Sequence, residues 1–175
     1  MSDGTFGVDM RQVGGAFISA RAVVCGDVTL GRDVSIWPHV VIRGDVAPIS
    51  IGDRTNIQDG AIIHCRTDVA LTIGCDVVIG HMAVVHCARV GDGCLIGIRS
   101  VVLDNAEVGN GAVIAAGAVV TPGTVIPPNM VAMGTPAKPV RPVTQTERDY
   151  HQMALGNYLR LSKEHMSGRW RPFGG

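Results

Sequence analysis

Apolar residues recur at every sixth position through most of this 175-residue chain, a period that neither a helix nor an ordinary strand has. A repeat this regular is typical of a solenoid, in which three six-residue segments form one triangular coil and the coils stack by parallel pairing. We therefore predict an all-β solenoid, a parallel β-helix of hexapeptide repeats, over residues 18–132. The residues predicted to point inward are Ile18, Val24, Leu30, Ile36, Ile42, Ile51, Ile57, Ile63, Ile73, Ile79, Val85, Val90, Ile96, Val102, Val108, Ile114, Val120 and Ile126.

The composition agrees with a narrow core. Hydrophobic residues make up 46% of the chain but aromatic residues only 4%, so Val, Ile and Ala are expected to fill a prism too thin for large rings. We expect a single domain overall. Residues 1–17 form an N-terminal segment before the prism, and residues 133–143 form a Pro-rich connector that cannot continue the ladder.

A C-terminal α-helix is predicted over residues 144–167, followed by a tail at 168–175. Thr144 and Glu147 have the spacing of a capping box at its start. One face carries large side chains at helical spacing, and we expect it to lie against a wall of the prism, in this chain or in a neighbour. The residues of that face are Tyr150, Met153, Ala154, Tyr158, Leu161 and His165.

Charge and cysteine usage exclude several classes of function. The formal net charge is zero and no basic run exists, so no nucleic-acid partner is expected. The N-terminus lacks a basic segment followed by an apolar stretch, and we expect no membrane role and a cytoplasmic location.

The five cysteines are expected to be reduced packing residues. Cys65 and Cys87 each follow a histidine, and one of them could instead be a metal ligand.

The repeat is interrupted three times, and all three interruptions lie around the histidines. Extra residues between Ile42 and Ile51, and again between Ile63 and Ile73, are expected to leave the prism as loops. One residue is missing between Val85 and the next inward position. Binding residues are commonly carried by irregular segments on a rigid scaffold, although neutral drift would give the same irregularity.

Three histidines in this stretch have positions that the repeat fixes. His64 and His86 both follow the inward residue of the second strand of a coil, as Arg43 does, so they project from one face as a column. His81 stands above Asp59 at a different edge of the prism. A metal site with three histidines would then need a second chain, and a cyclic homotrimer would form three such sites.

The alternative for these histidines is a general base that works without a metal. His39, His151 and His165 are expected to be solvated surface residues, and we assign them no role. Arg43 and Asp45 are open to either reading, as a structural clamp between chains or as part of the site.

The segments IRGD (42–45), NIQDG (56–60), His64 and GHxxxxH (80–86) resemble the γ-class carbonic anhydrases, and the similarity covers nearly the whole chain. It implies a left-handed β-helix, since handedness does not follow from the period, and a homotrimer. It further implies that His64, His81 and His86 bind Zn²⁺, or else Fe²⁺ or Co²⁺, whose bound hydroxide converts CO₂ to bicarbonate. The implied catalytic residues are Gln58, Asp59 and Tyr158, and the implied interfacial ion pair is Arg43 with Asp45.

One position departs from the pattern of the active relatives. They carry a glutamate directly after the RGD motif that helps to move the proton out, and here that residue is Val46. Because each cycle must pass a proton from the site to buffer, we expect weak hydration activity. The competing functions are an acyl-CoA-dependent transferase or thioesterase on the same scaffold, and a metal-binding trimer without catalysis.

Overall fold

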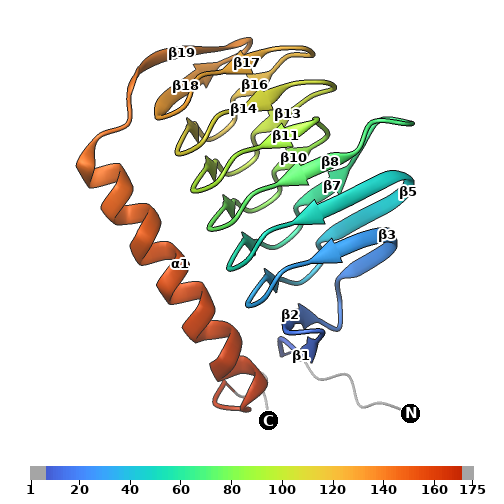
Figure 1. Cartoon of the computed structure of the whole chain (residues 1–175). Helices are drawn as coiled ribbons and strands as arrows, with labels where there is room; N and C mark the ends of the chain where they lie inside the picture. Colours follow the sequence, from blue (N-terminus) through green and yellow to red (C-terminus); the bar gives the residue numbers. More distant parts are fainter. Residues whose placement is uncertain (1–6, 171–175) are drawn as a thin grey trace.

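The computed structural model describes residues 7–170, and they form a solenoid of stacked triangular coils with one long helix along its side (Figure 1). The solenoid has about six turns and is a left-handed parallel β-helix, as predicted. Parts of the expected N-terminal segment (1–17) and tail (168–175) lie outside the described residues.

The first face of the prism is a sheet capped by an antiparallel hairpin at each end. Between the hairpins, its strands pair in parallel, one strand for each coil. In sheet order the strands are β1 (Met10–Val13), β2 (Ala16–Ser19), β4 (Ser35–Ile36), β6 (Asn56–Ile57), β9 (Val78–Ile79), β12 (Leu95–Ile96), β15 (Val113–Ile114), β18 (Met130–Gly134) and β19 (Ala137–Pro142).

The second and third faces are joined because β3 (Val23–Leu30) and β5 (Val41–Ile51) run through both of them. The other strands of the second face are β7 (Ile62–His64), β10 (Val84–Val85), β13 (Val101–Val102) and β16 (Val119–Val120). Those of the third face are β8 (Leu71–Ile73), β11 (Arg89–Val90), β14 (Glu107–Val108) and β17 (Val125–Ile126).

The predicted inward residues form the core. From Ile36 to Ile126 each is 3% exposed or less, and the parallel register aligns them coil upon coil. Ile18, Val24 and Leu30 are only partly buried because they belong to the first coil of the stack. The larger aromatic side chains Phe17 and Trp37 lie outside the prism, in a second cluster with Met10.

The interruptions of the repeat take two forms. The extra residues after Ile42 were expected to leave the prism as a loop, and the loop is wrong, because they lie within one continuous strand, β5, from Val41 to Ile51. Strand β3 pairs with β5 on either side of the extra residues, at Val41–Gly44 and Ile49–Ile51, so residues 45–48 bulge out of this ladder. The extra residues after Ile63 do form a loop, since no strand covers residues 65–70.

The Pro-rich segment also differs from expectation. Residues 133–143 were expected to be unable to continue a ladder, yet β19 pairs antiparallel with β18. Proline lacks an amide hydrogen, but β19 is the last strand of its sheet and needs donors on one side only. The hairpin covers the end of the stack where the coils stop (Figure 1).

Helix α1 (Gln145–Met166) begins with the predicted capping box, in which Thr144 and Glu147 satisfy each other's backbone N–H groups. Arg141 binds the Glu147 carboxylate, and this contact is the main reason that the pKa of Glu147 falls to about 2. None of the described residues form a helix long and apolar enough to cross a membrane.

The face of α1 that covers the prism differs in part from the predicted one. The helix runs along the first face of its own chain, but Tyr150 and Met153 are exposed. His151 takes their place and is buried, so the expectation that it is solvated is wrong. His165 is likewise half-buried, with its ring against Trp37. The helical period predicts an apolar stripe, but the docking angle decides which edge of that stripe is covered.

Candidate metal centre

His64 and His86 face each other on neighbouring coils of the second face. Strands β5, β7 and β10 are in the register that the repeat predicts, which places Arg43 beside His64 and His64 below His86. The nearest nitrogens of the two rings, His64 Nδ1 and His86 Nε2, are 3.2 Å apart. The ring centroids are 5.2 Å apart, close to one ladder spacing.

Carboxylates contact the outer nitrogens of both rings. His64 Nε2 is 3.0 Å from Asp45 Oδ1, and His86 Nδ1 is 2.5 Å from Asp104 Oδ1. The other oxygen of Asp45 accepts from Arg43, and these bonds to Arg43 and then to His64 lower the pKa of Asp45. A continuous line of polar contacts therefore runs along the second face from Arg43 to Asp104.

The tautomers that these contacts require leave an electron-rich gap. A carboxylate can only accept hydrogen bonds, so the outer nitrogen of each ring carries the hydrogen. When both imidazoles are neutral, each inner nitrogen then keeps a lone pair, and those of His64 Nδ1 and His86 Nε2 face each other across 3.2 Å. Such a pair is well suited to share a cation.

His81 lies at the corner between the first and second faces. This corner is a tight turn in each coil, with positive φ at Gly60 (72°) and at Met82 (58°). His81 Nδ1 is 3.1 Å from Asp59 Oδ2 on the coil below, as the repeat predicts. His81 Nε2 is 3.2 Å from the hydroxyl of Tyr158, which comes from α1.

The contacts of His81 thus repeat the pattern seen in the column, with one exception. The Asp59 carboxylate contacts Nδ1 of His81 and leaves Nε2 available, as in the column. Here, however, Nε2 contacts the Tyr158 hydroxyl instead of a second histidine. Burial is the main reason that the pKa of Tyr158 is raised, so this hydroxyl stays a donor.

Gln58 is buried on the first face, under the helix. Its amide donates to Asn56, whose own amide donates to Ser35, so a short polar line fixes Gln58 from behind. Asn56 lies in strand β6. Gln58, His81 and Tyr158 line the polar end of a cavity of about 260 Å³ between α1 and the first face, whose remaining walls are mostly aliphatic.

The predicted residues fall into two groups within one chain. His64, His86, Arg43 and Asp45 lie together on the second face, and the other group consists of Gln58, Asp59, His81 and Tyr158 at the corner and beneath the helix. Within residues 7–170, no set of three or more His, Cys, Asp or Glu side chains is arranged to hold one metal ion. A site with all three histidines would need residues from two chains.

The outward side chains beside the histidine column are aliphatic. One residue per coil stands outward just before the inward residue of the second face, and the register aligns these residues in what we call the aliphatic column. Ile62 in its middle is 45% exposed in the single chain. The column consists of Val23, Val41, Ile62, Val84, Val101 and Val119.

The cysteines do not take part in this arrangement. Cys65 and Cys87 are buried, and burial raises the pKa of both thiols, that of Cys87 to about 12. Both side chains belong to the hydrophobic core of the prism, so we assign them a packing role. All five cysteines are free.

Sequence reasoning missed Asp104. It follows Leu103, which occupies the histidine position of the next coil, so the column itself ends in an apolar side chain. Asp45 stands two residues after Arg43 and Asp104 only one residue after Leu103, so no single spacing in the sequence finds both carboxylates.

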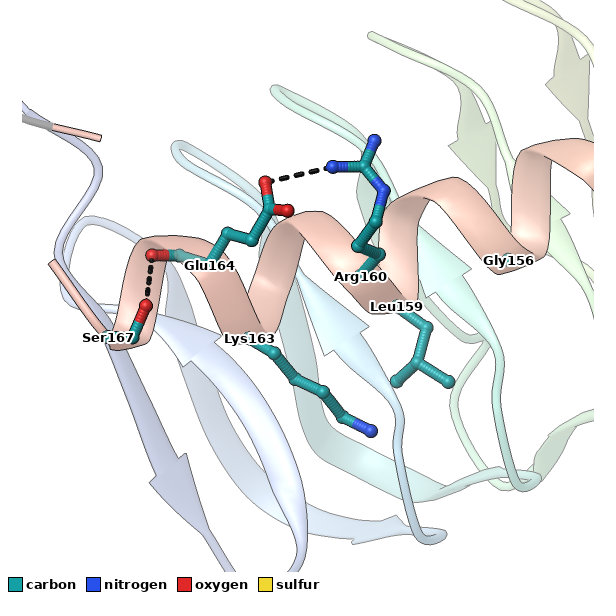
Figure 2. A pocket seen from close by; sticks show the side chains of 6 residues that line it. All are labelled: Gly156, Leu159, Arg160, Lys163, Glu164 and Ser167. Atoms are coloured by element: carbon teal, nitrogen blue, oxygen red, sulfur yellow. Dashed lines mark hydrogen bonds and ion pairs between the residues drawn. The ribbon is translucent and has the colours of Figure 1, made fainter. Parts of the chain in front are cut away.

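A larger cavity lies elsewhere and lacks the chemistry of the histidine groups. It has about 510 Å³ along one side of α1, where Arg160 and Glu164 form an ion pair (Figure 2). All of its lining residues belong to the last turns of that helix and its cap. We assign it no role.

Comparison of the sequence and the fold with known proteins identifies the class of protein to which this chain belongs. The family described as bacterial transferase hexapeptide (six repeats) matches residues 14–44 and 87–122, so the chain is a hexapeptide-repeat protein. A carbonic anhydrase from Geobacillus kaustophilus is 52% identical over 132 residues, which cover 75% of this chain and 72% of that protein. The mitochondrial gamma carbonic anhydrase 2 of Arabidopsis thaliana is 38% identical over 163 residues, covering 90% of this chain and 59% of that protein.

The chain therefore belongs to the γ-class carbonic anhydrase-like family. Solved structures give the same fold. A hexapeptide transferase family protein from Anaplasma phagocytophilum superimposes with a TM-score of 0.81 at 38% identity, covering 86% of this chain and 89% of that one.

Proposed function

We propose that this protein is a γ-carbonic anhydrase-like metalloenzyme that hydrates CO₂ reversibly to bicarbonate at metal centres between the subunits of a homotrimer. His64 and His86 of one subunit and His81 of a neighbour would hold the ion, with Zn²⁺ as the first candidate and Fe²⁺ or Co²⁺ as alternatives. The relatives named carbonic anhydrase support this activity.

The single observation that carries the proposal is the spacing of the two facing nitrogens. Two nitrogens bound to one tetrahedral zinc at roughly 2.0–2.1 Å lie ~3.3 Å apart. His64 Nδ1 and His86 Nε2 are 3.2 Å apart, and their outer nitrogens are already held by carboxylates. The pair fits a zinc ion with little rearrangement.

The surface around the pair supports a shared site. Two members of the aliphatic column, Val23 and Ile62, are exposed in the single chain and the other four are partly buried, and contiguous accessible aliphatic surface marks interaction sites. Met82 and Ile98, next to His81, are also half exposed or more. Packing this corner of one subunit against the second face of the next would cover both surfaces and bring His81 to the His64–His86 pair.

When bound, the ion would supply a water of lowered pKa as the nucleophile for CO₂. The residues of the chain would position the reactants. Gln58 is held rigidly by Asn56 and presents its amide to the cavity where CO₂ would arrive. Asp59 contacts His81 and would orient it, and the Arg43–Asp45 ion pair contacts His64 and would orient that ring and close the interface.

Proton release is the step that this chain supports least well. Val46 stands where the active relatives have a glutamate, and Asp59 already contacts His81. Activity is therefore expected to be weak and limited by proton transfer to buffer. Hydration should increase with buffer concentration and in a Val46→Glu variant, and stopped-flow measurement of CO₂ hydration checks both. Undiminished hydration after complete removal of metal would contradict the mechanism.

The second candidate function is acyl transfer or thioester hydrolysis, which the likeness to a hexapeptide transferase family protein favours. The mostly aliphatic cavity of about 260 Å³ next to His81 would suit an acyl group. That reaction needs an unmetallated histidine as base. A non-catalytic metal-binding trimer is the third candidate. Metal analysis together with the hydration assay separates the three.

A mixing experiment tests whether the site is shared. One variant carries His81→Ala, and the other carries both His64→Ala and His86→Ala, so neither homotrimer retains a complete site. After the two are unfolded and refolded together, each mixed trimer should regain one site, because at one interface the first variant supplies His64 and His86 and the second supplies His81. Mixed trimers that regain no tight Zn²⁺ binding would refute the sharing.

A further inference from the structure

His86 is held by a carboxylate that lies outside every motif of the family resemblance. Asp104 lies on the next coil, 18 residues further along the chain, and its Oδ1 lies 2.5 Å from His86 Nδ1. Its side chain is 40% exposed, and within the described residues His86 is its only ion-pair partner. The carboxylate therefore makes one strong contact, and that contact is with a candidate ligand.

The fold does not need this carboxylate for its turns. The backbone carbonyl of Asp104 accepts a hydrogen bond from the Gly123 amide of the next coil, at 2.8 Å, and Asn105 takes the positive φ of the corner. Stacking at this corner thus uses the backbone, while the side chain is directed toward His86.

Asp104 also differs from the carboxylate on the other side of the pair. Asp45 divides its two oxygens between Arg43 and His64, so a guanidinium compensates its charge. Among residues 7–170, no Lys or Arg side chain contacts Asp104. An uncompensated carboxylate polarises the imidazole more strongly, which makes the opposite nitrogen a better donor to a metal.

We propose that Asp104 is a positioning residue of the metal centre: it accepts the hydrogen bond from His86 Nδ1 and thereby directs the lone pair of Nε2 toward the ion shared with His64. This inference rests on the proposed function. Asp104 touches neither the ion nor CO₂, and it acts through the tautomer, orientation and basicity of His86. Removing such a partner typically lowers metal affinity 10–100-fold.

Two variants and a control test the role of Asp104. Asp104→Ala should weaken Zn²⁺ binding to the full-length protein by about 10–100-fold. Asp104→Asn should weaken it less, because the amide oxygen still accepts from Nδ1 but carries no charge. Asp149→Asn removes an exposed carboxylate from α1 and should leave affinity unchanged. Competition of Zn²⁺ with a chromophoric chelator gives the affinities.

A second readout, independent of metal, follows the ring itself. In metal-free protein, the ¹⁵N shifts of His86 should show the Nδ1–H tautomer, and Asp104→Ala should give a mixture of both tautomers. A purely structural role for Asp104 would leave the tautomer unchanged. If the alanine variant does not fold, Asp104→Asn decides by its affinity alone.

A His86→Ala arm separates this inference from the proposed function. If His86→Ala abolishes Zn²⁺ binding while both Asp104 variants bind as tightly as the wild type, the role of Asp104 is overturned and the metal centre stands. If His86→Ala leaves Zn²⁺ affinity unchanged, or if the wild type binds no Zn²⁺, the metal centre itself is wrong and Asp104 has no ligand to position.

Discussion

The second and third faces of the prism have the same backbone and nearly the same interior, but their outer surfaces differ. The aliphatic column of the second face runs through Ile62, whereas the matching positions of the third face are mostly polar. We call this second set the polar column, and it consists of Thr29, Ser50, Thr72, Arg89, Glu107 and Val125. The inward residues fix the coil, and the outward residues decide what each face can meet.

The glycines repeat the same contrast. In the position that holds Arg43, His64 and His86 on the second face, the third face has Gly52, Gly74 and Gly91. A Cβ at Gly74 would lie 2.7 Å from the backbone nitrogen of Asp92, so the third face turns too tightly there for a side chain. The second face has room for ligands at the equivalent point.

The largest expected effect comes from a charge in the aliphatic column. Ile62→Glu should dissociate the proposed homotrimer and abolish tight Zn²⁺ binding, because an unpaired charge between packed surfaces is strongly destabilising. Thr72→Glu is the matched control at the same position on the third face of the same coil and should change neither property. Sedimentation should give three times 18.4 kDa for the control and one times that mass for Ile62→Glu. Dissociation by both variants would contradict the contrast between the faces.

Substitutions inside the prism test the other half of the comparison. Ile63 and Ile73 are equally buried, at 0% and 1% exposed, beneath the second and third faces. Ile63→Ala and Ile73→Ala should each lower the free energy of unfolding by about 2–5 kcal/mol, since both leave a cavity of the same size. Urea denaturation measures the two losses. A much smaller loss at one position would show that the faces differ inside as well.

Helix α1 covers the first face and leaves the second and third faces uncovered in the single chain. We expect the packing of this helix to weaken in acid, because it buries His151. Burial holds the pKa of His151 below its ordinary 6.5, although nearby Asp76 acts in the opposite direction, and Nε2 has no hydrogen-bond partner among residues 7–170. Protonation is therefore less favourable in the folded protein than in the unfolded chain. The contribution of neutral His151 to the free energy of unfolding is therefore complete above pH 6.5 and decreases as the pH falls below 6.5.

His151→Leu should reduce this loss of stability between pH 6.5 and 5, as followed by thermal unfolding. His39→Asn is the control, because His39 is exposed and asparagine tolerates its positive φ of 63°. Half-buried His165 remains in both variants and keeps part of the acid response. An unchanged pH profile in His151→Leu would show that the buried ring does not control docking of the helix.

The smallest expected effect lies at the corner where the first and second faces meet. The Tyr158 hydroxyl contacts the nitrogen of His81 that would bind the ion, so it competes with the metal for that lone pair. Tyr158→Phe should tighten Zn²⁺ binding by about 1 kcal/mol, the usual net value of one hydrogen bond. Tyr150→Phe, on the same helix and exposed, should have no effect. Weaker binding in Tyr158→Phe would instead indicate that the hydroxyl supports the site.

Several elements of the fold follow from local rules in the sequence. Each coil is built by a six-residue period, so the inward residues and the stacking of His64 on Arg43 could be predicted without a structure. The capping box at Thr144 is equally local. The continuation of β5 could not be predicted, because the sequence gives no sign of whether extra residues will form a loop or a bulge within one strand.

What the sequence by itself determined is the set of positions that share a face, since the period and the alternation of side chains act within a few residues. Only the tertiary structure decided which side chains touch across coils and from the helix. Asp104 reaches His86 over 18 residues, and Tyr158 reaches His81 over 77. The burial of His151 depends in the same way on how α1 docks. Such contacts depend on side-chain reach and docking angle, which no period encodes.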